Sequence, residues 1–203
     1  LDQFFTKPDV VQQCINFFHQ FYKLGEFDLV IEPSSGNNDF VRGLQQYVTN
    51  DKLIWMDIDS IDEEHNKNFM LFEPPPEYEG SGKRILTIGN PPFGKNSSKA
   101  ILFFNRAACY SDVIAFIVPK TFRKQSFMNR LFCTFVLVGE MTLAANSFIF
   151  EGEDYNIECI FQVWKKTDVP RKSYKPRKET VDFMFVNDFD DIDIAVRRVV
   201  VNA

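Results

Sequence analysis

The 203-residue sequence has few of the residues that form metal sites and disulfides. Its two histidines lie near no cysteine at metal-ligand spacing, and no Cys-x-x-Cys pair occurs, so we predict no metal site. Three of the four cysteines have apolar neighbours and are interpreted as small buried residues of an intracellular protein in a reducing compartment, either cytoplasm or nucleus, of cellular, bacterial or viral origin. The four are Cys14 and this apolar group of Cys109, Cys133 and Cys159.

Long apolar runs and an overall positive charge are also missing. No stretch reaches the roughly 18 apolar residues of a membrane span, and nothing resembles a secretion signal. The net charge of −5 argues against indiscriminate binding to a polyanion. The charge is unevenly distributed, however, because residues 165–178 contain seven basic residues and one acid. This basic stripe is either a phosphate contact or a solvated linker.

Hydrophobic residues make up 45% of the chain, and phenylalanine is unusually frequent with 23 copies. This composition predicts one soluble domain with a substantial core that contains most of the aromatic rings. Apolar patterns predict strands over residues 27–31, 53–56, 84–88, 113–118, 135–143 and 157–164. Helices are expected over residues 8–24, 39–48 and 97–110. The alternation predicts an α/β fold with helices on both faces of a mostly parallel sheet.

The segment Asn90-Pro91-Pro92-Phe93 follows one of these strands directly. Two consecutive prolines cannot lie in a central strand, since neither can donate to the ladder, so the segment must lie just past the strand end. Asn90 offers an amide oxygen and an NH2 group, and backbone carbonyls add further acceptors. This set suits an exocyclic amino group, with Phe93 as a flat surface for a planar ring. The alternative interpretation is a rigid turn.

A second motif, Glu32-Pro33-Ser34-Ser35-Gly36, follows the first strand. Gly36 allows a sharp turn, the Glu32 carboxylate can pair with an ammonium group, and the next helix start offers N–H groups to a carboxylate. The motif lacks the Gly-x-Gly-x-x-Gly pattern, which favours a cofactor without phosphates over a dinucleotide. Asp57, after the second strand, can accept both hydroxyls of a ribose; Asp59 is the competing candidate and a helix cap the alternative role.

With Phe4-Phe5-Thr6-Lys7-Pro8 near the N-terminus, these motifs resemble, in their order, those of S-adenosylmethionine-dependent adenine-N6 DNA methyltransferases of the gamma class. The resemblance covers roughly residues 1–165 and implies a catalytic domain with a Rossmann-like seven-stranded sheet, one strand of which is reversed. Residues 166–203 would form a basic segment and C-terminal extension, too short for the family's usual target-recognition domain. Specificity would then come from a specificity subunit or dimer partner, from further sequence, or be absent.

The resemblance implies S-adenosyl-L-methionine as the cofactor and assigns roles to particular residues. Asn90, Pro91, Pro92 and Phe93 would hold the target, while Asn68-Phe69 stands where the family commonly has Asp-Phe. Cofactor contacts would come from Phe5, Thr6, Glu32, Pro33, Ser34, Gly36, Asp57, Ile58, Asn68, Phe69 and Asn90. Contacts to nucleic acid are expected from Lys95, Lys120, Arg123, Lys124, Lys165, Lys166, Arg171 and Lys172.

The implied function is methyl transfer to the N6 amino group of adenine in nucleic acid, with DNA slightly favoured over RNA. A base in a duplex must be flipped out to reach such a site. Two alternatives remain open: a protein methyltransferase that modifies a glutamine side-chain amide, and a non-catalytic methyltransferase-fold subunit of a larger assembly. The intact motifs favour an enzyme.

Overall fold

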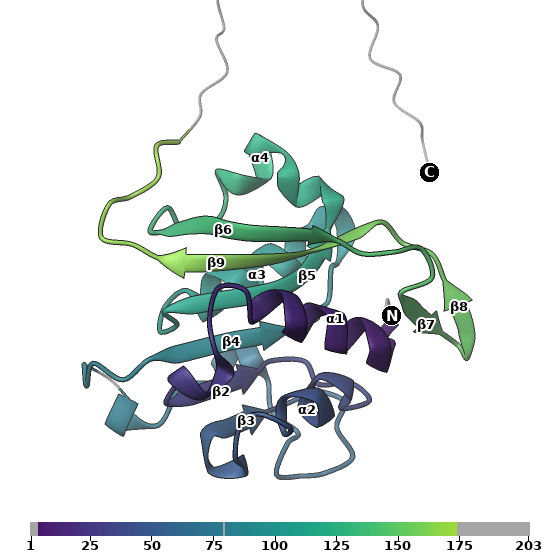
Figure 1. Cartoon of the computed structure of the whole chain (residues 1–203), viewed down its shortest axis with the longest axis horizontal. Coiled ribbons are helices and arrows are strands. Elements are labelled where there is room, and N and C mark those ends of the chain that lie inside the picture. Colours follow the sequence, from purple (N-terminus) through teal and green to yellow (C-terminus); the bar gives the residue numbers. More distant parts are fainter. Residues whose placement is uncertain (1–3, 79, 174–203) are drawn as a thin grey trace, which may run out of the picture. The chain divides into compact units, whose positions relative to one another are not determined.

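The computed structural model describes residues 4–78 and 80–173, whose centre is a six-stranded sheet of order β3-β2-β4-β5-β9-β6 (Figure 1). Its strands are β2 (Leu29–Glu32), β3 (Leu53–Trp55), β4 (Ile85–Gly89), β5 (Val113–Pro119), β6 (Phe135–Thr142) and β9 (Cys159–Lys166). β2, β3, β4 and β5 pair in parallel, and β9 is antiparallel to both β5 and β6. The expected α/β fold with one reversed strand is therefore confirmed.

The sheet has six strands in the described residues rather than the expected seven. The segment between β3 and β4 forms turns and two 3-10 turns, Phe69–Leu71 and Pro76–Tyr78, instead of another strand. Three consecutive prolines, Pro74 to Pro76, cannot donate to a strand ladder, which explains why this part of the chain adds no strand.

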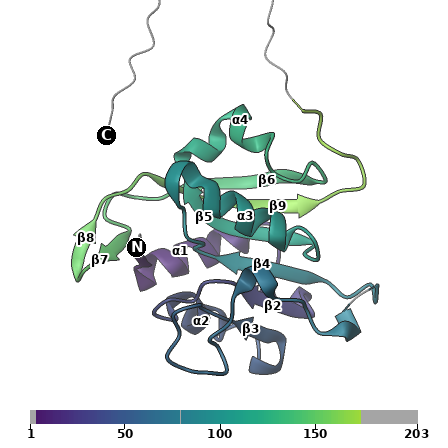
Figure 2. The ribbon, with the colours of Figure 1, turned by 180° about the vertical axis from the view of Figure 1, so that it is seen from behind.

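Helices cover both faces of the sheet. Figures 1 and 2 show α1 (Pro8–Phe18) in front of one face and α3 (Ser98–Ala107) in front of the other. α2 (Asp39–Leu44) packs against α1, and α4 (Gln125–Met128) is a single turn before β6. Further 3-10 turns lie at Leu24–Glu26, Asn50–Lys52, Lys95–Ser97 and Lys120–Arg123.

The first helix is shorter than its apolar pattern predicts. It ends at Phe18, and the chain then reverses so that Leu24 and Phe27 are buried on the same core. The rings of Phe18 and Phe27 lie 6.0 Å apart. A straight helix to residue 24 would carry these side chains away from Phe18, so tertiary packing overrides the helical period here.

A second, three-stranded sheet lies beside the first and was not predicted. Its strands are β1 (Phe5–Thr6), β7 (Phe148–Phe150) and β8 (Glu153–Tyr155), in the order β1-β7-β8 with antiparallel pairing. Strands of two or three residues are too short to show the alternation on which strand prediction depends. This small sheet fixes the N-terminal motif against the rest of the chain.

The structure corrects two of the cysteine assignments. Cys159 is buried as expected and Cys14 is also buried, but Cys109 and Cys133 are exposed. Cys109 lies in the turn after α3, and Cys133 precedes β6, so apolar neighbours in sequence did not ensure burial. Among the described helices, none is both long and apolar enough to cross a membrane.

Stability should depend strongly on Phe104, whose buried ring contacts Phe135 and Trp164 edge-on, at centroid distances of 5.7 and 5.4 Å. Phe104→Ala removes these contacts and leaves a cavity, so we expect a loss of about 3–5 kcal/mol in the free energy of unfolding, measured by urea denaturation. Leu102→Ala, on the same helix but 54% exposed, should change it by no more than about 0.5 kcal/mol. Equal effects of the two substitutions would contradict this packing.

Candidate functional site

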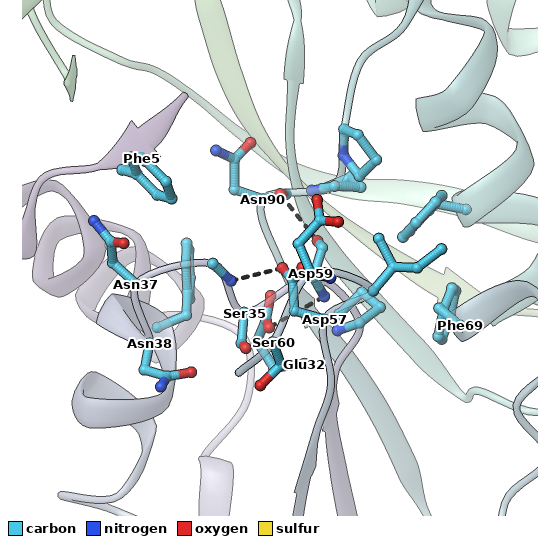
Figure 3. A pocket seen from close by; sticks show the side chains of 18 of the residues that line it. Phe5, Glu32, Ser35, Asn37, Asn38, Asp57, Asp59, Ser60, Phe69 and Asn90 are labelled. Carbon is cyan, nitrogen blue, oxygen red and sulfur yellow. Dashed lines mark hydrogen bonds between the residues drawn. The ribbon is translucent and has the colours of Figure 1, made fainter. Parts of the chain in front are cut away.

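A cavity of about 770 Å³ lies at the carboxyl ends of β2, β3 and β4. Its volume is in the range of roughly 300–1,000 Å³ that is typical of small-molecule sites. The structure brings together in this one cavity all the residues for which cofactor or target contacts were predicted. They are Phe5, Thr6, Glu32, Pro33, Ser34, Gly36, Asp57, Ile58, Asn68, Phe69, Asn90, Pro91, Pro92 and Phe93. Figure 3 labels five of them, namely Phe5, Glu32, Asp57, Phe69 and Asn90.

Glu32 is the most deeply buried charged residue of this cavity, with 1% of its surface exposed. Burial raises the pKa of the Glu32 carboxyl well above its usual value, and the nearby charge of Asp57 raises it further. The Ser34 N–H, which donates to Oε2 at 3.2 Å, partly opposes this pKa shift. A bound cation would favour the ionised carboxylate, so Glu32 suits an ammonium group.

Room for the Glu32 side chain depends on Gly89, the last residue of β4. A Cβ atom at position 89 would overlap Oε1 of Glu32. Any larger residue would therefore push the carboxyl out of its place. Sequence reasoning missed Gly89, although a glycine that closes a buried strand directly before Asn90 was a usable signal.

Asp57 joins two loops at the cavity wall. Its Oδ2 accepts a hydrogen bond from the Gly36 N–H at 2.8 Å, and its Oδ1 accepts one from the Asp59 N–H at 2.9 Å. Gly36 has φ +49°, a conformation that favours glycine, and the ring of Phe5 packs against it. Each Asp57 oxygen keeps a second lone pair, so the carboxylate can still accept hydroxyl groups.

Apolar walls enclose the space beyond Asp57. Ile58 lines the cavity although it is 62% exposed, and so do the stacked rings of Phe69 and Phe103, whose centroids are 5.1 Å apart. Asn68 uses its Oδ1 to accept the Met70 N–H at 3.0 Å, which leaves its NH2 group available. Sequence reasoning treated residue 103 only as part of a helix, because its place on α3 gave no separate signal.

Asn90 has an amide that is fixed at one end and free at the other. Its Nδ2 donates to the Thr6 hydroxyl at 3.1 Å and to the Phe4 carbonyl at 3.3 Å. Its Oδ1 is buried and has no hydrogen-bond partner in the described part of the chain. A buried unpaired acceptor costs about 1–3 kcal/mol, so this oxygen suits a ligand N–H.

Phe93 lines the cavity, but only 7% of its surface is exposed because the ring also packs in the core. The stacking of Phe93 on a target ring remains a prediction. Little of its surface is available for this contact as the chain stands.

None of the eight residues that are predicted to contact nucleic acid lines the cavity. Lys120 and Arg123, just past the end of β5, form ion pairs with Glu158 at 3.0 Å and Glu140 at 2.7 Å. Lys95 and Lys124 are exposed and do not line the cavity, whereas Lys67 and Lys99 do.

The described part of the basic stripe lies near the amino ends of the parallel strands, at the end of the sheet opposite to the cavity. Lys165 pairs with Val113 at the start of β5, and Lys166 pairs with Phe135 at the start of β6, whereas the cavity lies at the carboxyl ends of the parallel strands. The guanidinium group of Arg171 donates to carbonyl groups inside the fold, among them those of residues 135 and 128. Lys172 is exposed, and residues 174–178 lie outside the described residues.

No group of three or more potential metal ligands occurs within residues 4–78 and 80–173. Of the acidic side chains at the cavity, Glu32 and Asp57 accept hydrogen bonds from backbone N–H groups, and Asp39 pairs with Arg42. The carboxylates, the Asn90 amide oxygen and the aromatic rings of the cavity suit an organic ligand with an ammonium group, hydroxyl groups and a flat ring.

Comparison with known proteins gives no matching family model. ENHANCED DOWNY MILDEW 2 of Arabidopsis thaliana is 27% identical in an alignment that is 191 residues long, and the match covers 84% of this chain. The chain spans 14% of the length of that protein.

Three solved structures share the fold. A candidate RNA methyltransferase from Pyrococcus horikoshii is 16% identical with a TM-score of 0.62, and the match covers 82% of this chain and 88% of the other. The 23S rRNA methyltransferase ErmE is 14% identical with a TM-score of 0.54, covering 83% and 71%. The M protein of the type I restriction enzyme EcoKI is 16% identical with a TM-score of 0.53, covering 84% and 46%. The chain therefore has the class I methyltransferase fold, as its motifs predicted.

The raised pKa of Glu32 gives a testable pH dependence. The folded protein holds this proton to a higher pH than the unfolded chain, so unfolding becomes easier as pH rises above the usual carboxyl value of 4.5, until Glu32 ionises in the folded state. Glu32→Gln removes this contribution. The free energy of unfolding of the Glu32→Gln variant, minus that of the wild type, should therefore increase with pH across this range, by at most about 1.4 kcal/mol per pH unit.

The measurement is chemical denaturation of both proteins, without ligand, between pH 4 and the onset of alkaline unfolding. Glu64→Gln, a change at an exposed carboxyl, is the matched control and should show a nearly constant difference from the wild type. If the difference in free energy of unfolding between Glu32→Gln and the wild type were also independent of pH, Glu32 would be ionised in the folded protein throughout this pH range.

Proposed function

We propose that this chain transfers a methyl group from S-adenosyl-L-methionine to the N6 amino group of adenine in nucleic acid. The observation that carries the proposal is the amide of Asn90. Its NH2 group is held by Thr6 and Phe4, while its buried Oδ1 lacks a partner among the described residues and lies at the cavity. An exocyclic amino group would supply the missing donor.

The cofactor fits the remaining groups of the cavity. Glu32 would pair with the ammonium of the methionine moiety, and Asp57 would accept the ribose hydroxyls with its free lone pairs. Ile58 and the stacked rings of Phe69 and Phe103 would enclose the adenine of the cofactor. The cofactor supplies the electrophilic methyl group.

The chain's own part in the chemistry is to hold and orient the target nitrogen. An exocyclic amino group is a poor nucleophile because its lone pair is delocalised into the ring. Acceptance of its protons by Asn90 Oδ1 and by the Pro91 carbonyl favours a tetrahedral nitrogen with a localised pair. Holding this pair in line with the methyl carbon supplies the rest, since alignment is worth up to about 7–11 kcal/mol. As the nitrogen–carbon bond forms, the sulfur–carbon bond of the cofactor would break and S-adenosylhomocysteine would leave, and the proton lost by the target nitrogen would pass to solvent water.

DNA is the nucleic acid that we favour, because β1 carries the N-terminal motif that resembles the DNA-modifying class. This motif is part of the site, because the ring of Phe5 packs against Gly36 and the hydroxyl of Thr6 accepts a hydrogen bond from the Asn90 amide. RNA remains the alternative substrate, since a 23S rRNA methyltransferase is among the structures with the same fold. A glutamine amide would present a similar N–H donor, so protein is tested alongside both.

The decisive substitution is Asn90→Ala. It removes the acceptor, so transfer should fall by at least about a hundredfold, while affinity for the cofactor should change little. The chain is incubated with isotopically labelled cofactor and separate pools of DNA, RNA and protein, and the digested products are analysed by mass spectrometry. Labelled N6-methyladenine in the DNA pool is the expected result.

A matched variant separates the acceptor role from simple anchoring of the amide. Thr6→Val removes one partner of the Asn90 NH2 group but leaves Oδ1, so transfer should fall by about tenfold or less. Equal activity of wild type and Asn90→Ala would refute the proposed role. Label found only in glutamine residues would move the chain to the protein-modifying class.

Lys99 is the residue that we expect to contact a phosphate beside the target. Unlike Lys120 and Arg123 it forms no ion pair with a described residue, and unlike Lys95 it lines the cavity. The binding constant falls with salt, so its log–log slope is negative. Lys99→Met should make this slope less negative by about 0.9 for duplex DNA, or by about 0.7 for a single strand.

Fluorescence titrations of labelled oligonucleotides at several salt concentrations give this slope. The matched control is Lys166→Met, which removes an exposed lysine at the end of the sheet opposite to the cavity and should leave the slope unchanged. The reverse pattern, with only Lys166→Met changing the slope, would move the nucleic-acid contact to the basic stripe.

A further inference from the structure

Ser34 contacts both functional motifs of the cavity. Its backbone N–H donates to Oε2 of Glu32 at 3.2 Å, and its hydroxyl donates to the main-chain carbonyl of Asn90 at 3.1 Å. Glu32 ends β2 and Asn90 follows β4, so one serine ties together the ends of two neighbouring strands. Its side chain is partly buried and lines the cavity.

The contacts continue on both sides of Ser34. The side-chain NH2 group of Asn90 donates to Thr6 of β1, and its Oδ1 has no partner among the described residues. The direction of Oδ1 therefore depends on the position of the Asn90 backbone. In the other direction, the loop that contains Ser34 is fixed at Gly36 by Asp57. The result is a continuous path from the Glu32 carboxyl to the Asn90 amide.

The charge of Glu32 can alter the strength of this path. An N–H group donates a stronger hydrogen bond to an ionised carboxylate than to a neutral carboxyl group. Binding of a cation beside Glu32 favours the ionised form, and therefore tightens the bond from the Ser34 N–H. The Ser34 hydroxyl then holds the Asn90 carbonyl with less freedom.

We propose that Ser34 is a positioning residue that couples occupancy of the ammonium site at Glu32 to the geometry of the acceptor at Asn90. The inference rests on the proposed function and deepens it, because it predicts that the cofactor prepares the target site. Coupling between two sites is reciprocal, so the target should raise the affinity for the cofactor by the same factor.

The test compares wild type with Ser34→Ala. S-adenosylhomocysteine, which keeps the ammonium group but cannot transfer a methyl group, is titrated with and without a single-stranded adenine-containing DNA oligonucleotide. Oligonucleotide binding is also measured with and without S-adenosylhomocysteine. In the wild type each ligand should raise the affinity for the other, by about five- to tenfold, and in Ser34→Ala this factor should approach one.

Kinetics provide a readout that a purely structural role would not move. Ser34→Ala keeps the backbone N–H to Glu32, so the cofactor affinity measured without oligonucleotide should change by less than about threefold, whereas kcat should fall by about tenfold. Ser34→Thr retains a hydroxyl group and should restore both kcat and the coupling factor.

Ser35→Ala is the matched control. Ser35 also lines the cavity and donates its backbone N–H to Met56, a bond that the substitution leaves intact. This variant should keep the coupling factor of the wild type. Thermal unfolding of all variants checks that each is folded.

The outcomes separate this inference from the proposed function. A Ser34→Ala protein that transfers methyl groups with unchanged coupling overturns the role of Ser34 alone, as does a wild type whose two ligands bind independently. Failure of the folded wild type to bind S-adenosylhomocysteine overturns both proposals.

Discussion

The buried carboxyl group of Glu32 is the constraint around which the cavity is built. Burial of a carboxyl is unfavourable and raises its pKa, so the surrounding chain must leave room for it and supply a donor. Gly89 leaves the room because it has no Cβ, and Ser34 supplies the donor. A larger residue at position 89 or a rearranged loop at 33–36 would therefore disturb the core and the site together.

The parallel arrangement of β3, β2 and β4 explains why motifs far apart in sequence meet. The carboxyl ends of the three strands lie next to one another in the sheet. The parallel pairing alone therefore brings Glu32, Asp57 and the Asn90 motif close together. The small sheet completes the wall, since β1 brings Thr6 to the Asn90 amide. Fixing one end of that amide leaves its oxygen at the cavity, where no described residue donates a hydrogen bond to it.

The strands were predictable because buried parallel strands consist of short, nearly continuous apolar runs. β5 was expected over residues 113–118 and spans Val113–Pro119. Helix ends were less accessible, since the reversal after Phe18 is decided by its contact with Phe27, a contact that local pattern does not encode. Likewise, apolar neighbours in sequence suggested burial of Cys109, whose turn exposes it.

By itself, the sequence determined the fold class and the three motifs that follow β2, β3 and β4, because a parallel sheet brings the carboxyl ends of its strands together. Only the tertiary structure decided which atoms are free. It places the basic residues Lys165 and Lys166 at the end of the sheet opposite to the cavity, pairs Lys120 with Glu158, and leaves Asn90 Oδ1 without a partner among the described residues. The physical reason is that charge neutralisation and hydrogen-bond satisfaction depend on neighbours distant in the chain, which no local pattern specifies.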